Sequence, residues 1–155
     1  MRYSPLIIAL GICCFAPFSF SESVIRVIDG DSLVISPNRE IRLYGIDAPE
    51  YDQPYGKVAR LYLEKLLTDN EFSIEKCFPH KDTRDVCILT INSEGRSVDI
   101  GELMVKAGYA HDYFKYSRGK YLQIEREAKA SHRGMWKENV VNIKPWKHRH
   151  SSTQQ

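Results

Sequence analysis

The chain has 155 residues, of which 43% are hydrophobic and 27% are charged. This length and composition predict one globular domain with a substantial core, and they exclude an intrinsically disordered chain. The formal net charge is only +2 at pH 7, so a basic field over the whole molecule cannot explain nucleic-acid binding. Any such binding has to come from local arrangements of charge.

The first 21 residues predict an export signal. Arg2 is the only charged residue among them, and an apolar run from Leu6 to Phe20 leads to small residues at Ser19 and Ser21. The run is short for a membrane span, which needs roughly 20 apolar residues. A basic start, an apolar middle and a small-residue end are typical of a cleaved signal peptide, although an uncleaved anchor has the same pattern. We therefore expect a secreted or periplasmic protein with no stable membrane association after cleavage.

Loss of residues 1–21 would leave Cys77 and Cys87 as the cysteines of the mature chain. An even count in an oxidising compartment predicts a disulfide, whereas two separate buried thiols are the alternative. A loop of this length would contribute about 2–3 kcal/mol through its effect on the unfolded chain.

Alternating apolar residues predict five strands. They are Val24–Ile28, Leu33–Ile35, Glu40–Ile46, Glu71–Lys76 and Val86–Ile91. The first three are joined by Asp29-Gly30-Asp31 and Ser36-Pro37-Asn38, which are typical turn sequences. We therefore expect these three strands to form a meander.

Helical periodicity predicts three helices. They run from Pro54 to about Leu67, between a cap at Asp99 and a stop at Gly108, and from Tyr121 to Arg133. Five short strands with helices after the third and fifth predict an α+β fold, a five-stranded OB-fold β-barrel with three α-helices, over residues 22–137. Residues 138–155 lack periodicity, and we expect an irregular basic tail with a disordered end.

Two acidic clusters lie at predicted strand ends. Asp29-Gly30-Asp31 follows the first strand, and Asp47-Ala48-Pro49-Glu50 follows the third. If the second strand lies between them, the two clusters converge and offer the carboxylate and carbonyl oxygens that hard divalent cations prefer. Each cluster alone is also typical of a hairpin turn or an exposed loop.

Two arginines could complement such a cation. Arg42 lies on the strand that leads to the second cluster, and Arg84 lies just before the fifth strand. A planar guanidinium matches the oxygens of a phosphodiester. Taken separately, both positions also fit solvent-exposed arginines.

The residues from about Val24 to Trp136 resemble the thermonuclease family, the staphylococcal-nuclease-like domains. The matching segments are VIDGDSLVI (Val27–Ile35), RLYGIDAPE (Arg42–Glu50), TRDVCIL (Thr83–Leu89), VDIGELMVKAGYA (Val98–Ala110) and EREAKASHRGMW (Glu125–Trp136). Asp-Gly-Asp-Ser alone is a weak signal. Its combination with the Arg42–Glu50 segment, at this spacing, is specific.

The resemblance implies an OB-fold with three helices, a bound Ca2+ and hydrolysis of DNA and RNA that leaves 3'-phosphate ends. By position, the side chains of Asp31 and Asp47 and the main-chain carbonyl of Ala48 would bind calcium. Glu50 would position or deprotonate the attacking water. Arg42 and Arg84 would hold the phosphate and stabilise its transition state.

The sequence departs from the family before its second arginine. The family usually has Asp-x-Tyr-Gly-Arg, whereas residues 79–84 lack the tyrosine and the glycine. This puts in doubt both the Arg84 assignment and the usual contact to a terminal phosphate, for which Lys81 is a replacement as a point charge.

Aromatic residues interleaved with cations lie between the second and third predicted helices. Tyr113 and Tyr116 flank Lys115, and Arg118 follows them. This pattern favours stacking of bases and attraction of phosphates. Packing at the barrel mouth is the alternative interpretation.

The sequence therefore predicts an exported, calcium-dependent and monomeric endonuclease of little sequence preference, acting on DNA and RNA. The alternative is a noncatalytic nucleic-acid-binding OB-fold module. Members of the family that only bind have generally lost the acidic and arginine set, which is present here. A calcium-binding structural protein of the cell envelope is a third possibility, but it gives Arg42 no role.

Overall fold

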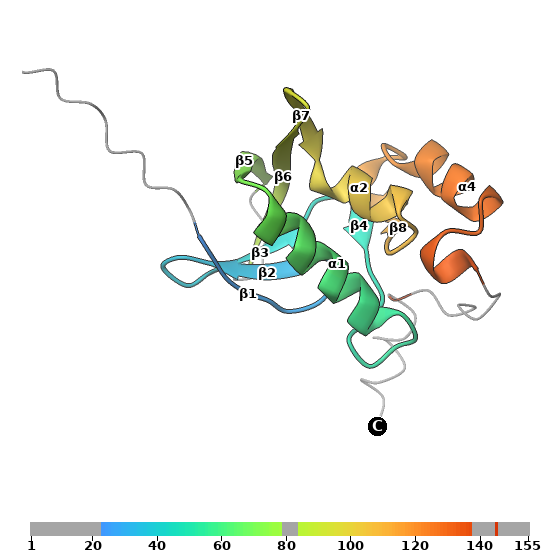
Figure 1. The fold of residues 1–155 in the computed structure, drawn as a ribbon, viewed down its shortest axis with the longest axis horizontal. Helices are drawn as coiled ribbons and strands as arrows, with labels where there is room; N and C mark the ends of the chain where they lie inside the picture. The colour runs from blue at the N-terminus through green and yellow to red at the C-terminus, as the bar shows by residue number, and fades with distance from the viewer. Residues whose placement is uncertain (1–22, 79–83, 138–144, 146–155) are drawn as a thin grey trace, which may run out of the picture.

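The computed structural model describes residues 23–78, 84–137 and 145 (Figure 1). The predicted signal at residues 1–21 and, apart from Pro145, the predicted tail at residues 138–155 lie outside the described residues. The strands are β1 (Val24–Val27), β2 (Ser32–Ile35), β3 (Arg39–Leu43), β4 (Ile46–Asp47), β5 (Phe72–Phe78), β6 (Asp85–Ser93), β7 (Arg96–Asp99) and β8 (His111–Asp112). The helices are α1 (Gly56–Asp69), α2 (Ile100–Lys106), α3 (Phe114–Ser117) and α4 (Leu122–Ala130), followed by a 3-10 turn at Gly134–Trp136.

The predicted α+β fold is confirmed. The main sheet has the order β1-β2-β3-β6-β5, which contains the five predicted strands, and β7 pairs with β6. β1, β2 and β3 form the expected antiparallel meander, β3 and β6 are parallel, and β5 and β6 are antiparallel. This mixed order is consistent with an OB-type fold, with β1 and β5 at the two ends of the pairing in the described part of the chain.

The prediction that the third strand continues to Ile46 is wrong. β3 ends at Leu43, and the chain turns at Gly45, which has a φ of +73° that favours glycine. An added side chain at Gly45 would also approach the backbone and side chain of Ser117. Beyond this turn, β4 leaves the main sheet and pairs with β8. Because of this turn, β4, which contains Asp47, does not continue the direction of β3.

Two short elements were not predicted. β7 pairs with the end of β6 and its first two residues are exposed, so it has no buried alternation to reveal it. α3 has four residues, which is too few for helical periodicity to show. The three predicted helices correspond to α1, α2 and α4.

The core lies between the sheet and the helices. β2, β3 and β6 contribute Leu33, Ile35, Ile41, Leu43 and Leu89, and the helices contribute Ala59, Leu63, Ile100 and Met104. Figure 1 shows α1 running along the sheet and α4 at the end of the molecule opposite the turn between β2 and β3, with α2 between the two helices. Burial of one such aliphatic side chain stabilises the fold by about 1.5–3 kcal/mol. No helix in the described residues is long and apolar enough to cross a membrane.

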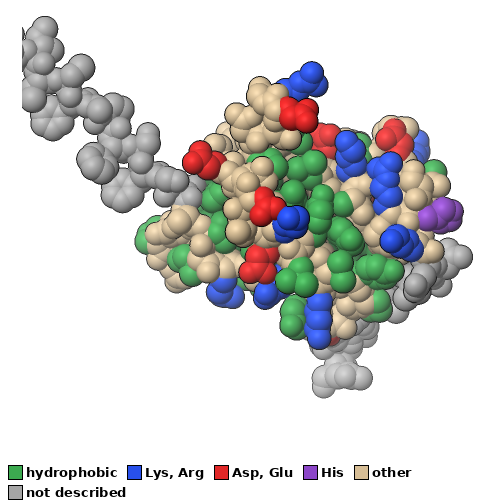
Figure 2. Space-filling model, in the orientation of Figure 1, with side chains coloured by type: hydrophobic (Ala, Val, Ile, Leu, Met, Phe, Trp, Pro, Cys, Tyr) green, Lys and Arg blue, Asp and Glu red, His purple; other side chains and the backbone are tan. Residues whose placement is uncertain are grey.

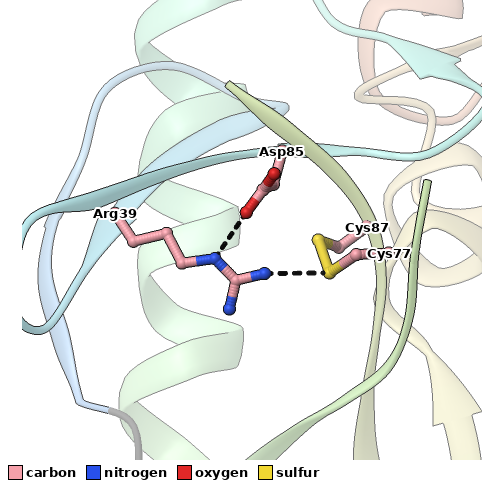
Figure 3. Close-up of a disulfide and its surroundings, with 4 residues drawn as sticks. All are labelled: Arg39, Cys77, Asp85 and Cys87. Atoms are coloured by element: carbon pink, nitrogen blue, oxygen red, sulfur yellow. Dashed lines mark hydrogen bonds and ion pairs between the residues drawn. A yellow bond between two sulfur atoms is a disulfide. The ribbon is translucent and has the colours of Figure 1, made fainter. Parts of the chain in front are cut away.

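The predicted disulfide is confirmed. Cys77 and Cys87 are directly opposite in the β5–β6 pair and their sulfur atoms are bonded. Beside them, Arg39 Nε lies 2.6 Å from Asp85 Oδ2, and Arg39 Nη2 lies 3.2 Å from Cys77 Sγ (Figure 3). The disulfide and this arginine tie β3, β5 and β6 together next to the point where β6 begins.

Replacing both Cys77 and Cys87 with alanine should lower the free energy of unfolding by about 2–3 kcal/mol, because the unfolded chain loses its cross-link. Denaturant unfolding of the wild type and of the double variant, each with and without reductant, measures this difference. Reductant should destabilise the wild type and leave the variant unchanged. Equal stability of the two oxidised proteins would contradict the expected contribution.

Candidate active site

One guanidinium joins two carboxylates from separate segments of the chain. Arg42 of β3 donates from Nη2 to Asp31 Oδ2 at 2.9 Å and to Asp47 Oδ1 at 2.6 Å. Asp31 immediately precedes β2, and Asp47 ends β4. Because both carboxylates reach the same nitrogen atom, the structure brings together three of the predicted site residues.

Both carboxylates are buried, with exposed fractions of 2% for Asp31 and 0% for Asp47. Asp31 also accepts hydrogen bonds from Ser32 Oγ at 2.8 Å and from the Ala48 backbone N–H at 3.0 Å. Buried charges are tolerated only when they are paired and hydrogen-bonded. Arg42 therefore compensates two carboxylates that would otherwise repel each other, and removing one partner of such a buried pair typically costs about 3–5 kcal/mol.

The turn before Asp31 places the first cluster against the second. The Asp31 backbone N–H donates to Asp29 Oδ1 at 2.9 Å, a local bond typical of aspartate in turns. Between them, a Cβ added at Gly30 would lie 2.7 Å from the Cβ atoms of both Ala48 and Ala59. Glycine at this position therefore allows the turn to touch both the Asp47-Ala48 segment and α1.

The pKa of Asp29 shows that negative charge is concentrated around these carboxylates. Its burial, followed by repulsion from Asp31, raises its pKa to about 7, while Arg42 acts in the opposite direction. The charge of Glu50 also raises this pKa, so Glu50 lies within electrostatic reach of the same cluster. An excess of carboxylates around one guanidinium favours the entry of a cation.

Glu50 follows the second carboxylate in a fixed turn. Its backbone N–H donates to Gln53 Oε1 at 2.8 Å, and the Gln53 N–H donates to the Glu50 carbonyl at 2.9 Å. A Cβ added at Gly56, the first residue of α1, would collide with the Glu50 carbonyl. The half-buried Glu50 is thus held between the Asp47 segment and the start of α1.

Arg84 immediately precedes β6, the strand that pairs with β3, on which Arg42 lies. The parallel register aligns Arg42 with Val86, and Arg84 Nε lies 3.8 Å from Glu40 Oε1. Arg84 therefore lies beside β3, the strand that carries Arg42. Its role in the site stays a prediction. Lys81 lies outside the described residues.

The predicted aromatic pair is attached to the turn between β3 and β4. The rings of Tyr113 and Tyr116 meet edge to face at 5.1 Å. The Tyr113 N–H donates to the Gly45 carbonyl at 2.9 Å, and the Tyr44 hydroxyl donates to the Tyr116 carbonyl at 2.7 Å. Tyr44 in turn stacks on Phe78 at 4.4 Å, a contact that no local sequence pattern predicted because it joins the turn after β3 to the end of β5.

The donor set fits a hard divalent cation. The carboxylates of Asp31 and Asp47 converge, and the bond from the Ala48 N–H to Asp31 fixes the Ala48 backbone beside them. Oxygen donors of this kind suit Ca2+, whose further ligands are commonly waters. Within residues 23–78 and 84–137, no group of three or more His, Cys, Asp or Glu side chains is placed to hold a metal ion, so the carboxylate donors of this site are two, Asp31 and Asp47.

A buried hydrogen bond supports the strand that β4, with Asp47, pairs with. In the register of the β4–β8 pair, Asp47 lies opposite His111. The His111 Nδ1 atom lies 3.0 Å from Glu125 Oε1 in α4. Lys129 Nζ lies 3.1 Å from the same Glu125 oxygen and 4.5 Å from the centre of the Trp136 ring. This contact links α4 through β8 to β4, and sequence reasoning missed it because only the spacing of Glu125 and Lys129 is visible locally.

Paired carboxylates beside a guanidinium on an OB-type sheet define a class of protein suited to binding phosphate esters through a cation. Residues 40–138 match the family model of staphylococcal nuclease homologues, and the chain belongs to that family, as the sequence predicted.

Three relatives illustrate the similarity. A probable staphylococcal-like nuclease, CAN2, of Oryza sativa subsp. japonica is 34% identical over 130 residues, which cover 83% of this chain and 34% of the relative. An uncharacterized endonuclease of Escherichia coli O157:H7 is 26% identical over 153 residues, covering 96% and 97%. A micrococcal nuclease of Shigella flexneri is 28% identical over 144 residues, covering 86% and 82%. The chain thus spans about a third of the length of the rice relative.

Replacing Glu125 with glutamine should lower the free energy of unfolding by about 1–3 kcal/mol at neutral pH, because charged hydrogen bonds of this carboxylate are lost. Burial by itself raises the pKa of Glu125, but the hydrogen bonds from His111 and Lys129 outweigh it and lower the pKa below its usual value of 4.5. The stabilisation is therefore present above pH 4.5 and disappears as the pH falls through the lowered pKa.

Denaturant unfolding at neutral pH and at pH values below 4.5 measures this dependence. The matched control is Glu127→Gln, because Glu127 is an exposed glutamate of the same helix that pairs with Gln123. A Glu125→Gln effect that equals the control effect, or that persists unchanged in acid, would contradict the account.

Proposed function

We propose that this chain is an exported, calcium-dependent endonuclease that hydrolyses phosphodiester bonds of DNA and RNA with little sequence preference and leaves 3'-phosphate ends. The observation that carries the proposal is the convergence of Asp31 and Asp47 on the guanidinium of Arg42. The nuclease names of the relatives support the same class of reaction.

In this proposal the carboxylates of Asp31 and Asp47 and the carbonyl of Ala48 hold Ca2+. The bound ion supplies positive charge that offsets the anionic charge by which a phosphodiester resists attack. Arg42 is suited to share the phosphate because its side chain is 19% exposed while it contacts both carboxylates. Its planar fork contacts two phosphate oxygens at once.

Glu50 is proposed to position the attacking water and to accept its proton. Such a base contributes typically about 10²–10⁴-fold to a rate. Its place three residues after Asp47, in the turn that ends against α1, supports this role. Arg84 is proposed to stabilise charge on the phosphate and on the leaving 5' oxygen, where a fixed guanidinium lowers the barrier electrostatically.

Substrate contacts outside the reacting phosphate are proposed for Tyr113 and Tyr116, with Lys81 as a further phosphate contact. Tyr116 is 40% exposed, and Lys115 Nζ lies 5.5 Å from the centre of its ring. Aromatic rings beside cations favour bases and phosphates together.

Export to an extracellular or periplasmic compartment is proposed from the pattern of residues 1–21. After cleavage of that segment, the mature chain is proposed to be a monomer with no stable membrane association. The Cys77–Cys87 disulfide supports an oxidising compartment. The alternative is a noncatalytic binding module, which would bind nucleic acid without cleaving it in calcium.

The purified chain should cleave single- and double-stranded DNA and RNA in calcium and should be inactive in chelator. Replacing Glu50 with glutamine should lower kcat by about 10²–10⁴-fold, because the base is lost while the binding groups remain. Gel assays of end-labelled substrates measure cleavage, and chemical analysis of the product ends should find 3'-phosphates.

A matched control is Glu127→Gln, because Glu127 is an exposed glutamate of α4 that pairs with Gln123. It should cleave at the wild-type rate. Nucleic-acid binding without cleavage in calcium would overturn the enzyme in favour of the binding module. Equal kcat for Glu50→Gln and the wild type would overturn the assignment of the base.

A further inference from the structure

An exposed aromatic side chain directly follows Glu50. Tyr51 is 51% exposed, whereas Tyr121 in the core is 1% exposed. A Cβ added at Gly56 would lie 3.0 Å from Tyr51 Cα, so the backbone of Tyr51 is packed against the start of α1. The ring is therefore presented to solvent from a backbone that is firmly placed beside the candidate active site.

Two cations of α1 approach this ring. Lys57 Nζ lies 5.5 Å and Arg60 Cζ lies 6.0 Å from the centre of the Tyr51 ring. Residues three apart project from the same side of a helix, so both cations and the ring form one surface at the start of α1. Figure 2 shows Lys and Arg side chains next to hydrophobic ones over α1.

Packing alone does not account for this surface. A half-exposed ring stabilises the fold less than a buried one, because the hydrophobic contribution scales with the area removed from water. The apolar surface also continues along the helix through Val58, which is 44% exposed, and Leu61, which is 58% exposed. An exposed ring between cations is instead the composition of surfaces on which unpaired bases stack and phosphates are held.

We propose that Tyr51, Lys57 and Arg60 form a second contact for single-stranded nucleic acid, beyond the scissile phosphate on the Glu50 side. The inference rests on the proposed nuclease function. A base stacks on the Tyr51 ring, and a neighbouring phosphate lies against the cations. Because stacking on a side chain needs an unpaired base, this contact favours single strands over duplexes.

The two cations contribute unequally. Arg60 Nη2 lies 3.3 Å from Glu64 Oε2, so a phosphate has to compete with that carboxylate. Lys57 is exposed, and the contact described for it is the Tyr51 ring. Lys57 therefore provides the larger part of the phosphate contact.

The test uses the full chain and an oligothymidylate of about ten nucleotides, a length within the usual site size of such surfaces. Fluorescence anisotropy in chelator measures binding without cleavage. In calcium, the ratio of kcat/KM for the oligonucleotide to kcat/KM for a dinucleotide measures the contribution of the extended strand. The variants are Tyr51→Ala, Tyr51→Phe and Lys57→Ala, and the control is Lys65→Ala, an exposed lysine of the same helix that pairs with Asp69.

Tyr51→Ala should weaken oligonucleotide binding about tenfold, the effect of losing one stacked base, and should lower the kcat/KM ratio to a similar extent. Tyr51→Phe should retain most of both, because the ring remains. Lys57→Ala should weaken binding and reduce the dependence of affinity on salt by about one counterion. Lys65→Ala should behave as the wild type.

Unchanged oligonucleotide binding by both Tyr51→Ala and Lys57→Ala would overturn the second contact, as would a wild type that does not bind the oligonucleotide. An equal loss of kcat/KM for dinucleotide and oligonucleotide would also overturn it, because the ring would then act at the reacting phosphate. A wild type that binds but does not cleave in calcium overturns the nuclease function alone, since the anisotropy comparison still decides the binding surface.

Discussion

The contact of Arg42 with Asp31 and Asp47 is the interaction on which the rest of the site depends. Two buried carboxylates would repel each other and would lose their hydration, so their convergence requires a positive charge between them. This contact joins the residue before β2, the end of β3 and the end of β4 at one point. A divalent cation would meet the same requirement, because it also places positive charge beside the two carboxylates.

The surrounding fold keeps these three segments in place. The turn at Gly45 directs β4 away from the main sheet, and its pairing with β8 gives Asp47 a second support. Through His111 and Glu125 that support extends to α4, which is distant in sequence from the carboxylates. At the other end of β3, Arg39 and the disulfide hold β3 to β5 and β6, close to Arg84. The site is thus set by contacts that are long-range in sequence.

The sequence predicted the elements whose signals are local or specific. Strand alternation located five of the six strands of the main sheet, helical periodicity located α1, α2 and α4, and the spacing of Asp31, Arg42 and Asp47 indicated the family. It failed where distant residues decide the structure. Apolar alternation continues past Leu43, so only the Gly45 turn and the β8 partner end the third strand. The bracing of Asp47 by His111 and Glu125, and the surface of Tyr51 beside α1, likewise depend on tertiary contacts.

Calorimetric titration with calcium tests most directly whether Asp31 and Asp47 form the cation site. We expect one ion per chain with a dissociation constant of about 10⁻⁴–10⁻³ M, as in extracellular calcium modules. Asp47→Asn should abolish this binding, while Asp69→Asn, which changes an exposed carboxylate that pairs with Lys65 in α1, should preserve it. Absence of calcium binding by the wild type, or equal affinity in Asp47→Asn, would show that Asp31 and Asp47 do not form a calcium site.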